Sequence, residues 1–180
     1  MNIKEAKKKA AVKIVIGVVI ALPSIVSTVI SFLKMIYYRL DDGTQFGSAL
    51  ARPFKQLVIW VYEHTQPLSV FWKHSPIPDH MNLSEPKNVY FIFIYMLFFV
   101  GIAFLASGKK LNIRIAKINE KIEDQLIEES IKGYNARSRE QIEASTQVSS
   151  SSIFSQLHQL YLAPLVTAVI GAIIIKALGM

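Results

Sequence analysis

Three long stretches of this 180-residue chain contain no Asp, Glu, Lys or Arg, and they constrain its fold more than any other feature. They cover residues 14–33, 88–108 and 144–175, and the third is apolar only from about Leu157 onward. A helix needs about 20 mostly apolar residues to cross a bilayer. Because the hydrocarbon interior offers no water to the backbone, such segments pair their backbone groups within a helix. The sequence therefore predicts an all-α membrane protein with three transmembrane helices.

The apolar residues, 52% of the chain, are clustered rather than spread at the periods typical of a soluble core. The net charge of +7 is clustered too. Residues 1–13 hold five Lys against Glu5, whereas residues 109–156 hold eight basic and seven acidic residues. A basic segment beside a span suits anionic lipid headgroups better than nucleic acid. We therefore expect the lipid bilayer as a partner and no nucleic acid.

The basic residues also predict an orientation. Five Lys precede the first span and five Lys or Arg closely follow the second, while the loop between them mixes six basic with five acidic residues. The positive-inside rule places the N-terminus in the cytoplasm and the C-terminus in the periplasm. The first apolar run exceeds the length of a signal-peptide core, and no A-x-A-like site follows it before Tyr37, so an uncleaved signal anchor is expected.

The predicted organisation divides the chain into seven segments. They are a basic cytoplasmic tail (1–13), transmembrane helix 1 (14–33), a periplasmic loop (34–87), transmembrane helix 2 (88–108), a cytoplasmic helical hairpin (109–152), transmembrane helix 3 (153–176) and a periplasmic tail (177–180). The protein is accordingly expected to be a multi-pass protein of the cell inner membrane.

The periplasmic loop contains an amphipathic stretch at residues 54–72. A fourth crossing is disfavoured there because Glu63 splits it into two runs that are too short to span. Apolar residues at spacings of three and four, together with Trp60 and Trp72, favour an interfacial or re-entrant helix. The alternative is a helix that packs on the rest of the loop without touching lipid.

The cytoplasmic segment is predicted to be a hairpin of two helices. Leu111, Ile115, Ile118 and Ile122 recur at 4-3-4 spacing, which predicts one amphipathic helix that continues straight out of the second span. Gly133 and Asn135 are candidate stop residues. A Ser-Arg-Glu-Gln sequence at 138–141 matches a capping box that would begin the second helix.

A face of small residues runs along the first span, at 4-3-4-3 spacing. Its members are Gly17, Ala21, Ser24, Thr28 and Ser31. Small residues let helix backbones approach closely. We expect this face to pack against the other spans of the same chain; the alternatives are a face that lines a conduit or binds an outside partner.

Residues able to support transport or catalysis are sparse. Ion-coupled transporters place charged residues inside the membrane, and these spans have none, which disfavours a coupled transporter built from this chain alone. His64, His74 and His80 lie in the loop with carboxylates, yet their spacing matches no zinc motif, so solvated histidines are expected rather than a metal site. No catalytic motif occurs, and no cofactor is expected.

Short sequence blocks along nearly the whole chain carry a resemblance to a known family. The blocks are Leu22-Pro23-Ser24, Ser27-Thr28 and Leu33-Lys34, then Phe71-Trp72, Ser75-Pro76 and Pro78, then 123–127 and 139–143, and finally Ile153-Phe154, Tyr161 and Pro164. In their order and spacing the chain resembles the YniB family of bacterial inner-membrane proteins. The resemblance implies a location in the inner membrane of a Gram-negative bacterium, and it implies no particular activity.

Two of these blocks fall on the predicted hairpin, where a plain charged spacer would need no particular sequence. We therefore hypothesise a partner surface there that includes Glu123, Asp124, Arg139 and Glu140. The favoured function is a non-enzymatic accessory, scaffold or assembly protein that binds a membrane-protein partner or forms a homo-oligomer. An oligomeric channel or transporter subunit is second, and a membrane enzyme with an unrecognised site is third.

Overall fold

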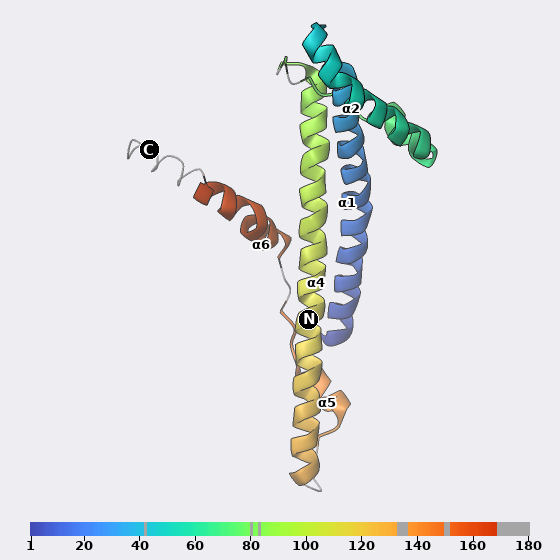
Figure 1. Cartoon of the computed structure of the whole chain (residues 1–180). Coiled ribbons are helices and arrows are strands. Elements are labelled where there is room, and N and C mark those ends of the chain that lie inside the picture. The colour runs from blue at the N-terminus through green and yellow to red at the C-terminus, as the bar shows by residue number, and fades with distance from the viewer. Residues whose placement is uncertain (42, 80, 83, 133–136, 150–151, 169–180) are drawn as a thin grey trace. The chain divides into compact units, whose positions relative to one another are not determined.

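The computed structural model describes residues 1–180 except 42, 80, 83, 133–136, 150–151 and 169–180. Within this part of the chain every regular element is a helix, so the all-α prediction is confirmed there (Figure 1). The elements are α1 (Ile3–Arg39), α2 (Gln45–His64), the 3₁₀ turn η1 (Gln66–Leu68), α3 (Ser69–His74), α4 (Pro86–Lys132), α5 (Arg139–Ser145), α6 (Ile153–Leu157) and the π-helical turn η2 (His158–Leu162).

Helices α1 and α4 contain the first two predicted spans. They have 37 and 47 residues, and both are long and apolar enough to cross a membrane. Only 33% of the most apolar window of α1 and 11% of that of α4 is buried within the chain. The core helix of a soluble protein would be mostly buried, and these two helices are candidate membrane spans by length and composition.

The third predicted span is described only in part. Helical turns run from α6 through η2 to residue 168, and residues 169–180 of the predicted span and tail lie outside the described residues. The count of three spans therefore stays a prediction.

The chain divides into two compact units. Unit 1 comprises residues 1–19 and 100–180, and unit 2 comprises residues 20–99. The core of unit 1 joins the start of α1, the later turns of α4, and α5 with the segment after it; its buried members are Ile3, Ala6, Ala10, Leu111, Ile115, Ile122, Ile142 and Val148. Residues 1–13, predicted to be a basic cytoplasmic tail, are helical from Ile3, where α1 begins, and pack into this core. Their cytoplasmic position stays a prediction.

In unit 1, α1 and α4 approach closely and run antiparallel. Gly17 faces Gly101 and Leu105, while Gly108 faces Ala10 and Ile14. A later residue of α1 therefore contacts an earlier residue of α4, which shows that the two helices are antiparallel. Along α4 the buried positions 101, 108, 115, 122 and 129 recur every seven residues. Such a repeat keeps one seam facing a neighbouring helix, as in coiled coils.

The predicted hairpin has two features that the structure confirms. Helix α4 is continuous from Pro86 to Lys132, so the apolar segment predicted as the second span runs into the amphipathic stripe. Ser138 caps α5 in a capping box with Gln141, and Ile142 of α5 is only 1% exposed. The candidate stop residues Gly133 and Asn135 lie outside the described residues.

In unit 2, the segment predicted as a single helix over residues 54–72 is broken. Helix α2 ends at His64, and η1 and α3 follow after Thr65, where Pro67 occupies the first turn of η1. A proline is well accommodated there because its missing N–H would have no partner. Helix α2 buries Ala51 and Val58 and leaves Leu50, Phe54, Leu57 and Trp60 exposed. Its interfacial or re-entrant placement stays a prediction.

Candidate functional site

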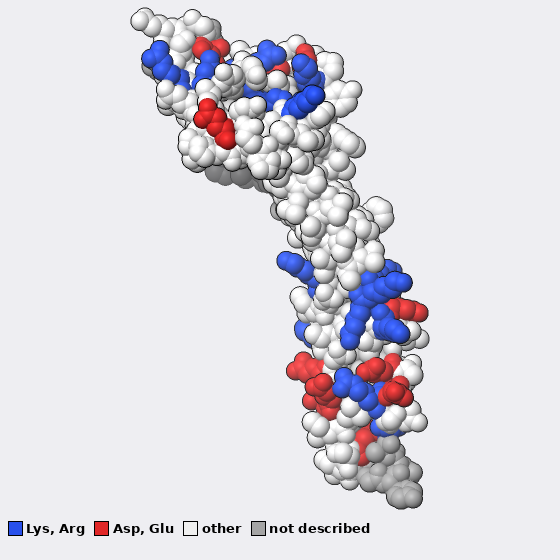
Figure 2. Space-filling view, turned by 90° about the vertical axis from the view of Figure 1, so that its right-hand side faces the viewer, with Lys and Arg blue, Asp and Glu red and all other residues white. Residues whose placement is uncertain are grey.

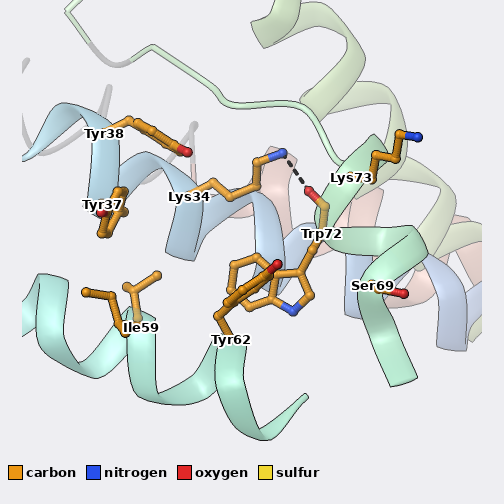
Figure 3. A pocket seen from close by; sticks show the side chains of 9 residues that line it. Lys34, Tyr37, Tyr38, Ile59, Tyr62, Ser69, Trp72 and Lys73 are labelled. Atoms are coloured by element: carbon orange, nitrogen blue, oxygen red, sulfur yellow. Dashed lines mark hydrogen bonds between the residues drawn. The ribbon is translucent and has the colours of Figure 1, made fainter. Parts of the chain in front are cut away.

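The candidate site in unit 2 is built around Lys34, one residue beyond the first predicted span. Its Nζ donates to the carbonyl oxygen of Trp72 at 3.0 Å (Figure 3) and to that of Ser75 at 2.7 Å. These carbonyls lie at the C-terminal end of α3, where acceptors have no partner within the helix. An ammonium group is favoured at such an end by the helix dipole as well. Lys34 therefore ties α3 to α1.

Two further side-chain hydrogen bonds extend this connection. Ser27 Oγ and Ser75 Oγ lie 2.8 Å apart, and both residues are buried. The indole Nε1 of Trp72 donates to Thr65 Oγ1 at 2.9 Å, at the break between α2 and η1. These hydrogen bonds hold α3 against α1 and against the turn that follows α2.

A cavity of about 590 Å³ lies beside this cluster (Figure 3). It is lined by Lys34, Tyr37, Tyr38, Val58, Ile59, Tyr62, Ser69, Trp72 and Lys73. The Tyr62 and Trp72 rings meet edge to face, with centroids 5.2 Å apart. Aromatic walls with a few polar groups are typical of small-molecule sites.

The charged side chains that line the cavity near Lys34 are basic. Among the described residues, no Asp or Glu lines the cavity. Burial lowers the pKa of Lys34, and the charge of Lys87 lowers it further. The carboxylates described nearby are engaged elsewhere, since Asp79 pairs with Arg39 at 3.0 Å and Asp41 pairs with Lys55 at 2.8 Å.

The loop histidines are not gathered with carboxylates in the described part of the chain. His64 Nδ1 lies 2.7 Å from Trp60 O and His74 Nδ1 lies 2.8 Å from Val70 O, each within its own helix. His80 lies outside the described residues. Among the described residues no group of three His, Cys, Asp or Glu is placed to hold a metal ion.

The small-residue face of α1 lies mainly inside the chain. Gly17, Ala21, Ser24 and Ser31 are buried, and Thr28 is half-buried and donates to Ser24 O at 2.7 Å. Ser31 Oγ has no hydrogen-bond partner among the described residues. This burial supports packing within the chain over a surface that lines a conduit.

The hypothesised cytoplasmic partner surface is only partly brought together. Arg139 pairs with Glu143 at 3.0 Å and lies 3.9 Å from Glu123; Arg139 and Glu123 are exposed, and Glu143 is half-buried. Asp124 and Glu140 are exposed as well. Exposed pairs of this kind contribute about 0–1 kcal/mol, so they leave these side chains available to another protein.

The sequence did not predict that Lys34 would meet Trp72 and Ser75. One signal was present: Ser27, Lys34, Trp72 and Ser75 all belong to the blocks that carried the family resemblance. The structure brings these separated blocks together through hydrogen bonds in unit 2.

Comparison with known proteins agrees with that resemblance. The family model described as YniB-like protein matches residues 15–180. The chain is 34% identical over 179 residues to a Yersinia pestis protein named "Putative YfeABCD regulator YfeE", covering 99% of this chain and 97% of that protein. It is 32% identical over 179 residues to the Escherichia coli K12 protein named "Uncharacterized protein YniB", covering 99% of both chains. No solved structure matches.

Proposed function

The chain belongs to the YniB-like family, and from that membership we propose that it is an inner-membrane accessory protein that regulates or assembles a membrane-protein partner. The relative from Yersinia pestis is named as a regulator of YfeABCD, which favours a regulatory role over a catalytic one. The names of the two relatives specify no enzyme activity.

The observation that carries the membrane part of the proposal is the outward-facing apolar surface of both long helices. In α4, Val89, Ile92, Phe93 and Met96 are each more than half exposed. In α1, Val19 and Leu22 are exposed to a similar extent. Water would make such surfaces costly at about 25 cal/mol per Å², whereas lipid covers them without cost.

The charge distribution supports a cytoplasmic start of α1. Lys4, Lys7, Lys8 and Lys9 are exposed on its first turns, and Figure 2 shows Lys and Arg side chains gathered on the surface of unit 1. Farther along α4 the basic and acidic side chains alternate. Under the positive-inside rule, this distribution of charge favours a cytoplasmic position for this end of the helix pair.

The cytoplasmic part of α4 offers a surface for a partner. Asp124, Ile127 and Ile131 recur at spacings of three and four, so they share one face of the helix. Ile127 is 63% exposed and Ile131 is 81% exposed. This face combines an acidic group with large apolar side chains, which suits an apolar partner segment that carries basic residues.

The test is crosslinking in living cells, followed by purification in mild detergent and mass spectrometry. A photoreactive residue at Ile127 should capture a membrane protein, and the double variant D124K/I131E, with the same photoreactive residue at position 127, should lose that capture. Gln125→Lys adds a positive charge to the same helical turn on another face and should keep it. Equal partner profiles for the photoreactive chain with and without D124K/I131E would refute the proposal.

An oligomeric channel is the second candidate. Its support is limited to the small-residue face, and that face is already buried within the chain. Purified protein in liposomes should therefore release no more trapped solute than empty liposomes do.

A further inference from the structure

Lys34 also lines a second cavity in unit 2, of about 470 Å³. The end of the α1 segment in this unit, the segment that follows α3, and the first turns of α4 form its walls. The volume lies in the range of about 300–1,000 Å³ that small-molecule sites occupy. The lining residues that matter here are Lys34, His74, Ser75, Lys87, Tyr90 and Ile94.

The polar end of this cavity is positively charged. Lys34 and Lys87 both line it, and no Asp or Glu in the part of the chain that the structure describes does so. The two ammonium groups repel, as the effect of Lys87 on the pKa of Lys34 indicates. Lys34 uses two hydrogen bonds on the carbonyls of Trp72 and Ser75, and an ammonium group has three donors. An anion between the two lysines would relieve the repulsion and accept the third hydrogen bond.

The other end of the cavity is apolar and follows the membrane helix. Tyr90 and Ile94 are four residues apart on α4, so they lie on one face. Both belong to the predicted second span, whereas Lys34 and Lys87 lie just outside the first and second spans. The cationic end of the cavity therefore matches the headgroup of a phospholipid, and the apolar end matches an acyl chain.

We propose that this cavity binds one anionic phospholipid of the outer leaflet of the inner membrane. Its phosphate contacts Lys34 and Lys87, and one acyl chain lies along Tyr90 and Ile94. The inference rests on the membrane placement proposed above, and it goes beyond general contact with the bilayer because it names a single site and a lipid charge.

Native mass spectrometry of the detergent-purified full chain tests the site. Phosphatidylglycerol should bind with a stoichiometry of one and more tightly than phosphatidylethanolamine. Each lysine near a membrane surface is worth about 1 kcal/mol toward anionic lipid, so Lys87→Gln should weaken phosphatidylglycerol binding about fivefold. Lys34→Gln should weaken it at least as much.

The matched control is Arg52→Gln, which removes the same charge from an exposed position on α2 outside the cavity. It should leave the affinity for phosphatidylglycerol unchanged. Because Lys34 also holds α3, its variant can lose structure, and Lys87→Gln keeps the test valid since Lys87 is exposed. A photoreactive phosphatidylglycerol with its reactive group in the acyl chain should label the peptide that contains Tyr90 and Ile94.

Three results would overturn the inference. They are equal binding of phosphatidylglycerol and phosphatidylethanolamine, an equal loss in Arg52→Gln and Lys87→Gln, or complete displacement of the lipid by inorganic phosphate at the lipid's own concentration. The last result would identify a site for a free anion instead. Each leaves the partner crosslinking at Ile127 intact, so a failed lipid site and a failed accessory function are distinguishable.

Discussion

A β-carbon added at Gly17 would lie 2.8 Å from Leu105 N and 2.9 Å from Gly101 O. Both neighbours are backbone atoms of α4, which cannot move aside as a side-chain end can. We expect Gly17→Val to destabilise the protein by about 1–3 kcal/mol, the usual cost of overpacking. Thermal unfolding in detergent measures the change. Val19→Leu, which adds bulk at a position 65% exposed, should change stability little, and equal losses for both variants would contradict the packing described.

Asp41 is held ionised by its neighbours. Its pKa is lowered from 3.8 to about 2, first by the hydrogen bond from Lys55 and then by those from Ser48 and Gly43. Because the folded-state pKa is the lower one, Asp41 contributes stability above about pH 3.8, and the contribution is lost as the pH falls toward 2. In Lys55→Gln the pKa should rise toward 3.8, as a carboxyl-carbon NMR titration would measure. Lys73→Gln should leave it unchanged; a shift there of similar size would argue against the local pairing.

At the residue scale, the spacing of small residues was the signal that the sequence offered. The small size of Gly17 and its place on a periodic face predicted a close helix contact, and the described geometry has one. Lys34 was different, because its carbonyl partners lie 38 and 41 residues away in the chain. A local sequence pattern does not predict which distant backbone carbonyls a lysine will contact, because that depends on the path of the whole loop between them.

At the scale of elements, α5 depends on a cap and on one side chain. It has seven residues, too few for a helix to be stable alone, and its Ile142 is packed into the unit 1 core. Ile142→Ala should cost about 2–5 kcal/mol locally and increase amide hydrogen exchange over residues 138–148. Ile131→Ala truncates the same residue type at 81% exposure and should leave exchange unchanged. Unchanged protection in Ile142→Ala would show that α5 is held by something else.

The helices of unit 1 were predicted correctly where apolar periodicity was used, and less well where charge alone was used. The 4-3-4 stripe of α4 predicted a continuous helix correctly. In residues 1–13 the lysines suggested a tail, although Ile3, Ala6 and Ala10 already recur at spacings of three and four. These residues lie on the same helix face as Gly17 and Ala21, and the positions on this face are buried both in residues 1–13 and in the predicted first span. A break such as the one at Thr65 is harder to predict, because Glu63 and Pro67 interrupt the apolar pattern without fixing the turn that results.

At the scale of the whole molecule, the central claim is that α1 and α4 cross the inner membrane in opposite directions. The native chain has no Cys, so single cysteines report their own accessibility. Ser84 lies in the predicted periplasmic loop and Glu140 on the predicted cytoplasmic hairpin, and both are exposed. Neither position belongs to the buried core.

The most direct measurement is therefore labelling of Ser84→Cys and Glu140→Cys with a membrane-impermeant maleimide, before and after the inner membrane is permeabilised. The account predicts that Ser84→Cys is labelled in intact cells and that Glu140→Cys is labelled only after permeabilisation. Labelling of both cysteines in intact cells, or of neither, would contradict it.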